Sequence, residues 1–244
     1  MIGIVSIAAG LLAICGVAVW YAVAAPESQW LGPVLGRGPS DSRAVALTFD
    51  DGPGEQTPAI LDILRDHGVR ATFFLCGSNV ERFPALARRI ADEGHGIGNH
   101  TYSHPRLLGR SPGRIALEID RAQRVIFHRT GCQPSLFRPP YGLRWFGLFP
   151  ILARNGMTAV MWSVNSLDWR LTARQIVERV LGQTRPGSII VLHDGVPPRA
   201  RGDRSATVEA LPEILRELGT RYRLVTVSEF LCAAAPGLRP AASD

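Results

Sequence analysis

The sequence predicts an α/β domain in which helices cover a parallel sheet that is either open or closed into a barrel. Three observations lead to this fold class. Apolar runs alternate with amphipathic segments along residues 43–232. The amphipathic segments begin and end at capping residues. The apolar runs show little polar alternation, as is typical of parallel strands buried on both faces. With 244 residues, 46% of them hydrophobic, the chain can build one large core.

Five apolar runs are expected as strands. They span residues 44–49, 69–75, 158–162, 188–192 and 223–227. Four amphipathic segments between them are expected as helices, each with a polar or proline-containing start, and three of them with a glycine stop. Their ends are marked by Thr57 and Gly68, by Ser111 and Gly131, by Thr172 with Gln175 in a capping-box pattern, and by Thr207 and Gly219.

The N-terminal segment has a different composition. No charged residue occurs from Ile2 to Ala25, a run long enough to span a hydrocarbon core as a helix. We therefore expect residues 1–25 to be a transmembrane anchor; a cleaved signal segment is the alternative, with small residues at Ala22 and Ala24 as a cleavage site. Residues 26–42, rich in Gly, Pro and Ser, are expected as a linker, and residues 233–244 as a flexible tail.

The charge composition excludes two enzyme classes. All 27 basic residues are arginine, so the chain has neither a Schiff-base lysine nor the lysine of a phosphate-binding loop. The formal net charge of +6 favours anionic partners such as a membrane or a cell-wall polymer. No interleaving of basic and aromatic residues points to nucleic acid. Of the four cysteines, Cys15 lies in the apolar segment; the other three, Cys76, Cys132 and Cys232, indicate no particular disulfide and no metal site.

Polar side chains follow several of the predicted strands. Asp50 and Asp51 end the first apolar run, His193 ends the fourth, and Asp168 comes shortly after the third. A plain turn would explain the Asp-Asp-Gly-Pro stretch alone. However, active sites of parallel α/β folds lie at the carboxyl ends of the strands, so these groups are expected to share one site.

His100 and His104 add a metal-ligand pattern. They are four residues apart, so one short helical turn could direct both imidazoles at a common point. Exposed loop histidines are the alternative for this spacing alone. Two histidines and one carboxylate leave coordination positions open, as in a catalytic divalent site. One of Asp50 and Asp51 could bind the cation while the other takes a proton from the attacking water.

Five ordered motifs make the chain resemble the polysaccharide deacetylases, which share a NodB homology domain and form carbohydrate esterase family 4. The motifs are TFDDGP (48–53), HTYSH (100–104), RPPYG (138–142), SLDW (166–169) and LHD (192–194). The resemblance covers residues 43–232 and implies a distorted (β/α) barrel that removes acetyl groups from sugars by hydrolysis. It implies Asp50 as the base. It also implies a divalent metal held by Asp51, His100 and His104, namely zinc, with Co²⁺, Mn²⁺ or Ni²⁺ as alternatives.

The resemblance also implies roles for the remaining motifs. The backbone N–H of Tyr141 would stabilise the oxyanion, and His193 would protonate the departing amine as general acid. Asp168 would orient His193 and raise its pKa. Asn165 stands where many relatives carry an acidic residue, but Asp168 is retained.

Three further residues are assigned in the same way. Arg138 would pair with Asp50, and Trp169 and Leu192 would form an apolar pocket for the acetyl methyl group. Arg138 as a surface ion-pair partner and Trp169 as plain core are the structural alternatives. The RGD tripeptide at 201–203 lies in an arginine-rich loop and is interpreted as chance.

The sequence thus predicts a membrane-anchored, metal-dependent polysaccharide N-deacetylase with its catalytic domain outside the cytoplasm, or a secreted enzyme if the N-terminal segment is cleaved. The expected partners are an acetylated glycan, such as peptidoglycan or another N-acetylhexosamine polymer, and the membrane. An O-acetyl esterase, a deformylase acting on a lipid-linked sugar and a non-catalytic sugar-binding relative are the alternatives.

Overall fold

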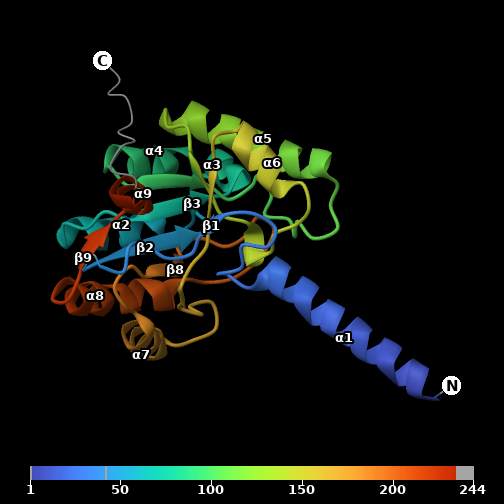
Figure 1. Ribbon diagram of the computed structural model, residues 1–244. Coiled ribbons are helices and arrows are strands. Elements are labelled where there is room, and N and C mark those ends of the chain that lie inside the picture. Colours follow the sequence, from blue (N-terminus) through green and yellow to red (C-terminus); the bar gives the residue numbers. More distant parts are fainter. Residues whose placement is uncertain (1, 42, 235–244) are drawn as a thin grey trace.

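A single parallel sheet organises the chain (Figure 1). The computed structural model describes residues 2–41 and 43–234, without the side chains of residues 2–9, 11, 12, 233 and 234. Within these residues the strands are β1 (Val34–Leu35), β2 (Ala44–Asp50), β3 (Thr72–Leu75), β4 (Gly96–Asn99), β5 (Leu136–Phe137), β6 (Thr158–Val160), β7 (Val164–Asn165), β8 (Ile189–His193) and β9 (Arg223–Val225).

The strands run in the order β1-β6-β5-β4-β3-β2-β8-β7. β9 pairs with the start of β2, where Ala46 has Val225 as a partner on one side and Ile189 on the other. In the described residues the end strands β1 and β7 do not pair with each other, so the barrel is incomplete. The α/β class and the parallel sheet are confirmed, and the barrel is a distorted half-barrel.

Helices cover the sheet. They are α2 (Thr57–Asp66), α3 (Gly77–Arg82), α4 (Pro84–Asp92), α5 (Pro112–Thr130), α6 (Leu148–Arg154), α7 (Ala173–Gln183), α8 (Ser205–Gly219) and α9 (Val227–Ala234), with a 3-10 turn η1 (Pro140–Gly142). The expected capping box is present: Thr172 accepts from the backbone N–H of Gln175 and starts α7. Gly131 ends α5 with a φ of 75°, which favours glycine.

The largest apolar cluster lies between the central strands and the helices on one face of the sheet. It joins side chains of β2, β3 and β8 to those of α2, α7 and α8. Each fully buried Leu, Ile or Phe stabilises such a core by about 1.5–3 kcal/mol. The central strands are therefore fixed rigidly, and their carboxyl ends are held in place.

Several elements were not predicted. β4 was missed because its glycines hide the strand pattern. A Cβ on Gly98 would lie 2.3 Å from Cδ1 of Phe74, so this strand needs glycine to pack against β3. β5 and β7 have two residues each, too few for a periodic signal.

The segment expected as a linker, residues 26–42, contains a strand and a bridge in its described part, residues 26–41. β1 pairs with β6 through Val34 and Ala159, and Arg37 forms an isolated bridge with Ser188. The segment therefore packs onto the domain. At the other end, α9 extends to Ala234, and the rest of the expected flexible tail lies outside the described residues.

The N-terminal segment forms one helix, α1 (Ile2–Ala24), which projects away from the domain in Figure 1. Arg144 holds its base, because the guanidinium donates to the backbone carbonyls of Val23, Ala25 and Ser28. Among the residues described here, no helix meets the length and apolarity required of a membrane span.

Candidate active site

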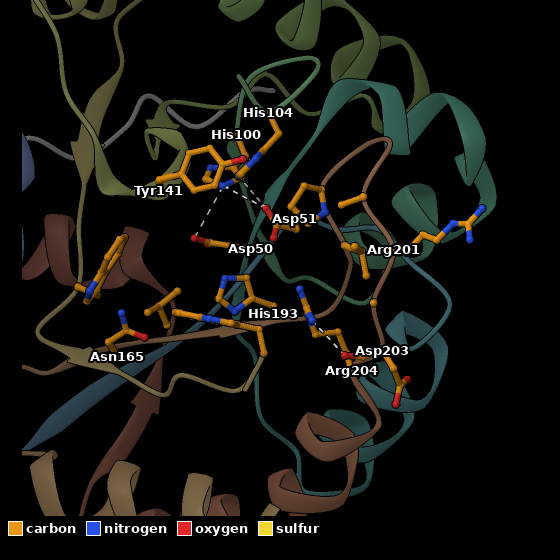
Figure 2. A pocket seen from close by; sticks show the side chains of 17 residues that line it. Asp50, Asp51, His100, His104, Tyr141, Asn165, His193, Arg201, Asp203 and Arg204 are labelled. Atoms are coloured by element: carbon orange, nitrogen blue, oxygen red, sulfur yellow. Dashed lines mark hydrogen bonds and ion pairs between the residues drawn. The ribbon is translucent and has the colours of Figure 1, made fainter. Parts of the chain in front are cut away.

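Two central strands end in opposed polar residues. β2 and β8 are neighbours, and Asp50 and His193 are register partners at their carboxyl ends. Both side chains line a cavity of about 590 Å³ (Figure 2). Polar groups that end separate strands thus line one cavity.

Asp51, His100 and His104 form a compact buried cluster at one side of this cavity. Oδ1 of Asp51 lies 3.0 Å from Nε2 of His104 and 3.5 Å from Nε2 of His100. The helical turn expected for the two histidines is absent. They lie in an irregular loop after β4, in which Thr101 and His104 have positive φ angles.

The cluster fits a divalent cation. Ligand atoms 2.0–2.1 Å from a tetrahedral metal lie about 3.3 Å apart, close to both measured separations. Oδ1 of Asp51 is buried and accepts no hydrogen bond in the described residues, so a positive partner there would satisfy it. Burial alone would raise the pKa of Asp51, but His100 and His104 hold that pKa well below its usual range. The carboxylate is therefore charged and ready to bind a cation.

The orientation of His100 is fixed from behind. Its Nδ1 lies 2.7 Å from the carbonyl oxygen of Arg138, so Nδ1–H donates and Nε2 is left with its lone pair toward Asp51. This contact ties the RPPYG motif to the histidine loop. Such support is typical of metal-ligating histidines.

Unusual backbone geometry is concentrated at the site. Six non-glycine residues in the described part of the chain have positive φ angles, and five belong to or adjoin the site motifs. These five are Asp51, Thr101, His104, Tyr141 and Leu167. Strained backbone is kept where it directs functional side chains, so this clustering supports an active site.

Asp50 is bound by a buried arginine. Nη1 of Arg138 lies 2.7 Å from Oδ1 of Asp50, and the guanidinium also donates to Thr48 and to two backbone carbonyls of residues 160 and 161. Arg138 is fully buried. It is therefore no surface ion-pair partner, and it fixes the Asp50 rotamer.

His193 is held by Asp168 in the same manner. Nδ1 of His193 lies 2.7 Å from Oδ1 of Asp168, whose Oδ2 accepts from the backbone N–H of His193 and from the hydroxyl of Thr207. Burial by itself lowers the pKa of His193, but the Asp168 carboxylate, aided by Asp51 and Asp50, raises it to about 9. The imidazole is therefore protonated near neutral pH, with Nε2–H free to donate into the cavity.

The aromatic residues lie where the motifs indicate, but Leu192 does not. Trp169 lines the cavity with its ring 5.1 Å from that of His193, and the Tyr141 ring lies 4.6 Å from that of His104. Leu192 is fully buried in the core, on the opposite face of β8 from its neighbours Val191 and His193. Side chains alternate along a strand, so a pocket residue at 193 excludes one at 192.

The structure adds residues that the motifs do not indicate. Trp162 lines the cavity, and Trp162 and Asn165 also line an adjoining pocket formed with residues 26–37. Asn79 donates to the carbonyls of Asp51 and Val196 and so joins two loops of the site. Only their three-dimensional positions show these roles.

Asp194 is a further buried carboxyl group of the LHD motif. Oδ2 accepts from the hydroxyl of Thr57, and Oδ1 has no partner in the described residues. Burial, helped by the nearby negative charge of Asp51 and Asp50, raises its pKa to about 7. A Cβ on Gly52 would lie 2.2 Å from Oδ2 of Asp194, which explains the glycine after the two aspartates.

Known proteins with a similar sequence agree with this geometry. Residues 37–160 match the model of the polysaccharide deacetylase family. The chain belongs to that family. A peptidoglycan-N-acetylglucosamine deacetylase of Bacillus cereus is 41% identical over 199 residues, which are 78% of this chain and 69% of the relative. A chitooligosaccharide deacetylase of Bradyrhizobium is 42% identical over 193 residues, 75% of this chain and 87% of the relative.

A solved structure supports the same assignment. The crystal structure of a peptidoglycan N-acetylglucosamine deacetylase in complex with 4-naphthalen-1-yl-N-oxidanyl-benzamide is 40% identical. It superposes with a TM-score of 0.77 and covers 81% of this chain and 92% of its own. The protein described here is thus a polysaccharide deacetylase, a hydrolase of linear amides, with a buried Asp-His-His cluster suited to a divalent metal.

Proposed function

We propose that this deacetylase removes N-acetyl groups from an N-acetylglucosamine polymer, either peptidoglycan or a chitin-like oligosaccharide. The observation that carries the proposal is the pair Asp50 and His193, opposed across one cavity beside the Asp51–His100–His104 cluster. One group is a carboxylate and the other a protonated imidazole. Amide hydrolysis needs this combination, because a proton must leave the attacking water and another must reach the departing amine.

Proton acceptance, proton donation and oxyanion stabilisation would each fall to a different residue of the chain. Asp50, oriented by Arg138, accepts the proton of the attacking water at its free carboxylate oxygen. His193, oriented by Asp168, donates its Nε2 proton to the amine nitrogen as the C–N bond breaks. The backbone N–H of Tyr141 donates to the oxyanion, and its left-handed φ of 59° sets the direction of that peptide.

The acetyl methyl group would lie against the aromatic side of the cavity. Trp169 and Trp162 line it together with Val191. Val191 takes the position that the sequence assigns to Leu192. A small apolar wall of this kind favours a short acyl group and excludes water from the carbonyl carbon.

The metal would be zinc, bound by Asp51, His100 and His104. Two imidazoles and a carboxylate suit zinc, and Co²⁺, Mn²⁺ or Ni²⁺ could occupy the same donors. When bound, the cation supplies Lewis acidity that polarises the acetyl carbonyl and lowers the pKa of the attacking water.

The N-terminal helix would anchor the domain to a membrane, with the catalytic domain outside the cytoplasm. The charge-free run Ile2–Ala25 supports this, as do the exposed apolar side chains along the described part of α1. Trp20, Tyr21 and Trp30 are exposed at the base of the helix, where aromatic residues of anchored proteins meet the membrane interface.

Acetate release tests the function directly. The purified, metal-loaded protein is incubated with N-acetylglucosamine oligomers, peptidoglycan glycan, O-acetylated xylan and an N-formyl lipid-linked sugar. We expect free acetate and new amines only from the N-acetylated glycans. Acetate from xylan alone would identify an O-acetyl esterase, formate alone a deformylase, and binding without any release a sugar-binding protein.

A further inference from the structure

The loop after β8, residues 195–204, forms one wall of the catalytic cavity and carries three arginines. Arg201 and Arg204 line this cavity, whereas Arg199 lines a neighbouring pocket and not the cavity. Figure 2 shows the guanidinium of Arg204 pointing into the cavity on the side of His193. The arginine-rich sequence that includes the RGD tripeptide is therefore part of the active site.

Arg204 is a buried cation that forms no ion pair among the described residues. Only 7% of the residue is exposed, and its single hydrogen bond runs from Nη1 to the carbonyl oxygen of Asp203 at 3.0 Å. Its Nε has no acceptor, and no carboxylate of the described residues lies within ion-pair distance of it. Buried guanidinium groups are normally paired, so this one is open to an anionic partner.

The nearest acidic residue is already engaged. Oδ1 of Asp203 accepts from the backbone N–H of Ser205 and from the side chain of Gln56, and Oδ2 accepts from the hydroxyl of Ser205. Asp203 thus binds Ser205, the first residue of α8, and ties the loop to the segment before α2. Asn79 holds the other end of the loop through Val196, so Arg204 is presented by a fixed support.

The other charges of the cavity are matched. Arg138 pairs with Asp50 at 2.7 Å, and His193 pairs with Asp168 at 2.7 Å. Asp51 belongs to the metal cluster. The wall therefore carries two arginines, Arg204 and the exposed Arg201, that form no ion pair with a carboxylate of the described residues.

We propose that Arg204, with Arg201 at the rim, binds a carboxylate of the glycan chain beside the acetamido group that is cleaved. A guanidinium fork matches a carboxylate with two parallel hydrogen bonds. The preferred substrate class is then an acidic N-acetylhexosamine polymer, such as peptidoglycan with its carboxylate-bearing sugars, over neutral chitin oligomers. This inference rests on the deacetylase function proposed above and adds a specificity-determining subsite to it.

The test compares substrates with and without a free carboxylate, and the acid and its methyl ester form the matched pair. Peptidoglycan oligomers with free carboxylates, the same oligomers as methyl esters, and chitotetraose are incubated with the parent protein, with Arg204→Met and with Arg199→Met. The control variant removes the same charge from the same loop but outside the cavity. Acetate release gives kcat and KM for each combination.

We expect the ratio of kcat/KM for free acid to methyl ester to fall about 10- to 100-fold in Arg204→Met, mainly through KM, since a charge-assisted pair is lost. Arg204→Lys should keep part of the preference, because it retains the charge without the fork. Arg199→Met should leave the ratio unchanged. The parent should prefer the acid to its ester and to chitotetraose.

Other outcomes would overturn the inference. Equal losses on acid and ester in Arg204→Met would mean that Arg204 acts on the reaction itself or on folding. A parent that does not distinguish acid from ester has no such subsite, and this comparison decides the matter even if Arg204→Met does not fold. Absence of acetate from all three substrates would instead refute the proposed deacetylase function.

Discussion

Asp50 and His193 are direct register partners on adjacent parallel strands, so the proposed base and the proposed acid face one cavity from neighbouring strand ends. Each is oriented by its own buried partner, Arg138 and Asp168 respectively. The two proton-transfer groups are thus fixed independently of each other. Their roles can be separated by substitution.

Asp50→Asn should retain the metal and lose about 10²- to 10⁴-fold in kcat, because the ligands remain while the proton acceptor is gone. His193→Ala should lose a similar factor on an acetamido sugar and much less on an aryl acetate, whose phenolate departs without a proton. Acetate release from both substrates measures this. Equal damage on both substrates would refute His193 as the general acid.

Replacement of a ligand should remove the metal without unfolding the domain. His100→Ala and His104→Ala should each lose bound metal, since two of three protein ligands are insufficient for tight binding. Circular dichroism should stay unchanged, because the cluster lies at the strand ends and outside the core. The control is His128→Ala, an exposed histidine of α5. Full metal content in both variants, measured by elemental analysis, would refute the ligand set.

The pH profile should report His193. Its proton is required for catalysis, so activity should fall as the pH rises through the pKa of the imidazole, which Asp168 raises. In Asp168→Asn the negative charge is lost, the pKa falls, and the alkaline limb should move to lower pH by about one unit or more. A bound cation repels the imidazolium, so the limb of the loaded enzyme lies below 9 in both proteins. An unmoved limb in kcat/KM profiles would contradict this role.

Arg138→Met should destabilise the fold by about 3–5 kcal/mol, because it leaves the buried carboxylate of Asp50 without its partner. The matched control is Arg174→Met, which breaks an exposed pair with Glu178 and should change stability by less than about 1 kcal/mol. Urea unfolding gives both values. A loss in Arg138→Met as small as in the control would contradict a stabilising buried pair between Arg138 and Asp50.

The proposed role of the N-terminal helix determines whether the protein is found in the membrane fraction or in the soluble fraction. If residues 2–25 form the anchor proposed above, the intact protein should sediment with membranes and resist extraction by salt and by carbonate. A mature N-terminus near Ala25 or Pro26 in the soluble fraction would instead identify a cleaved signal segment. N-terminal sequencing of both fractions distinguishes these outcomes.

The sequence predicts the parts of this fold that carry a local signal. The strand that ends at Asp50 is a continuous apolar run, the helix that starts after Thr172 has a capping box and apolar residues at helical spacing, and both are confirmed. β4 is not predicted, because its glycines give no apolar pattern. Gly96 and Gly98 are required by the side chains of the neighbouring strand β3, which lie where a Cβ atom would be. Short strands such as β7 are defined by their pairing with a neighbouring strand, and two residues carry no sequence pattern of their own.

The sequence predicts some residues of the candidate site and misses others. Ordered motifs indicate Asp51, His100 and His104, and these residues lie together. The prediction that Leu192 lines the pocket is not met, because successive side chains of β8 point to opposite faces of the sheet. A sequence motif does not show which face each of its residues occupies. Arg204 carries no sequence signal, since a missing counter-charge is a property of surroundings that the chain order does not reveal.

If α1 is the membrane anchor proposed above, its attachment to the domain limits where the enzyme can act. Arg144, which holds the base of that helix, follows Tyr141 by three residues, and the pocket lined by residues 26–37 shares Trp162 and Asn165 with the catalytic cavity. In Figure 1 the helix leaves at the end of the sheet toward which β2 points. With α1 inserted in a lipid bilayer, the cavity has almost no tether length and stays at the lipid surface. Deacetylation is then limited by depth: strands newly assembled against the bilayer are within reach, and the outer layers of the wall are not.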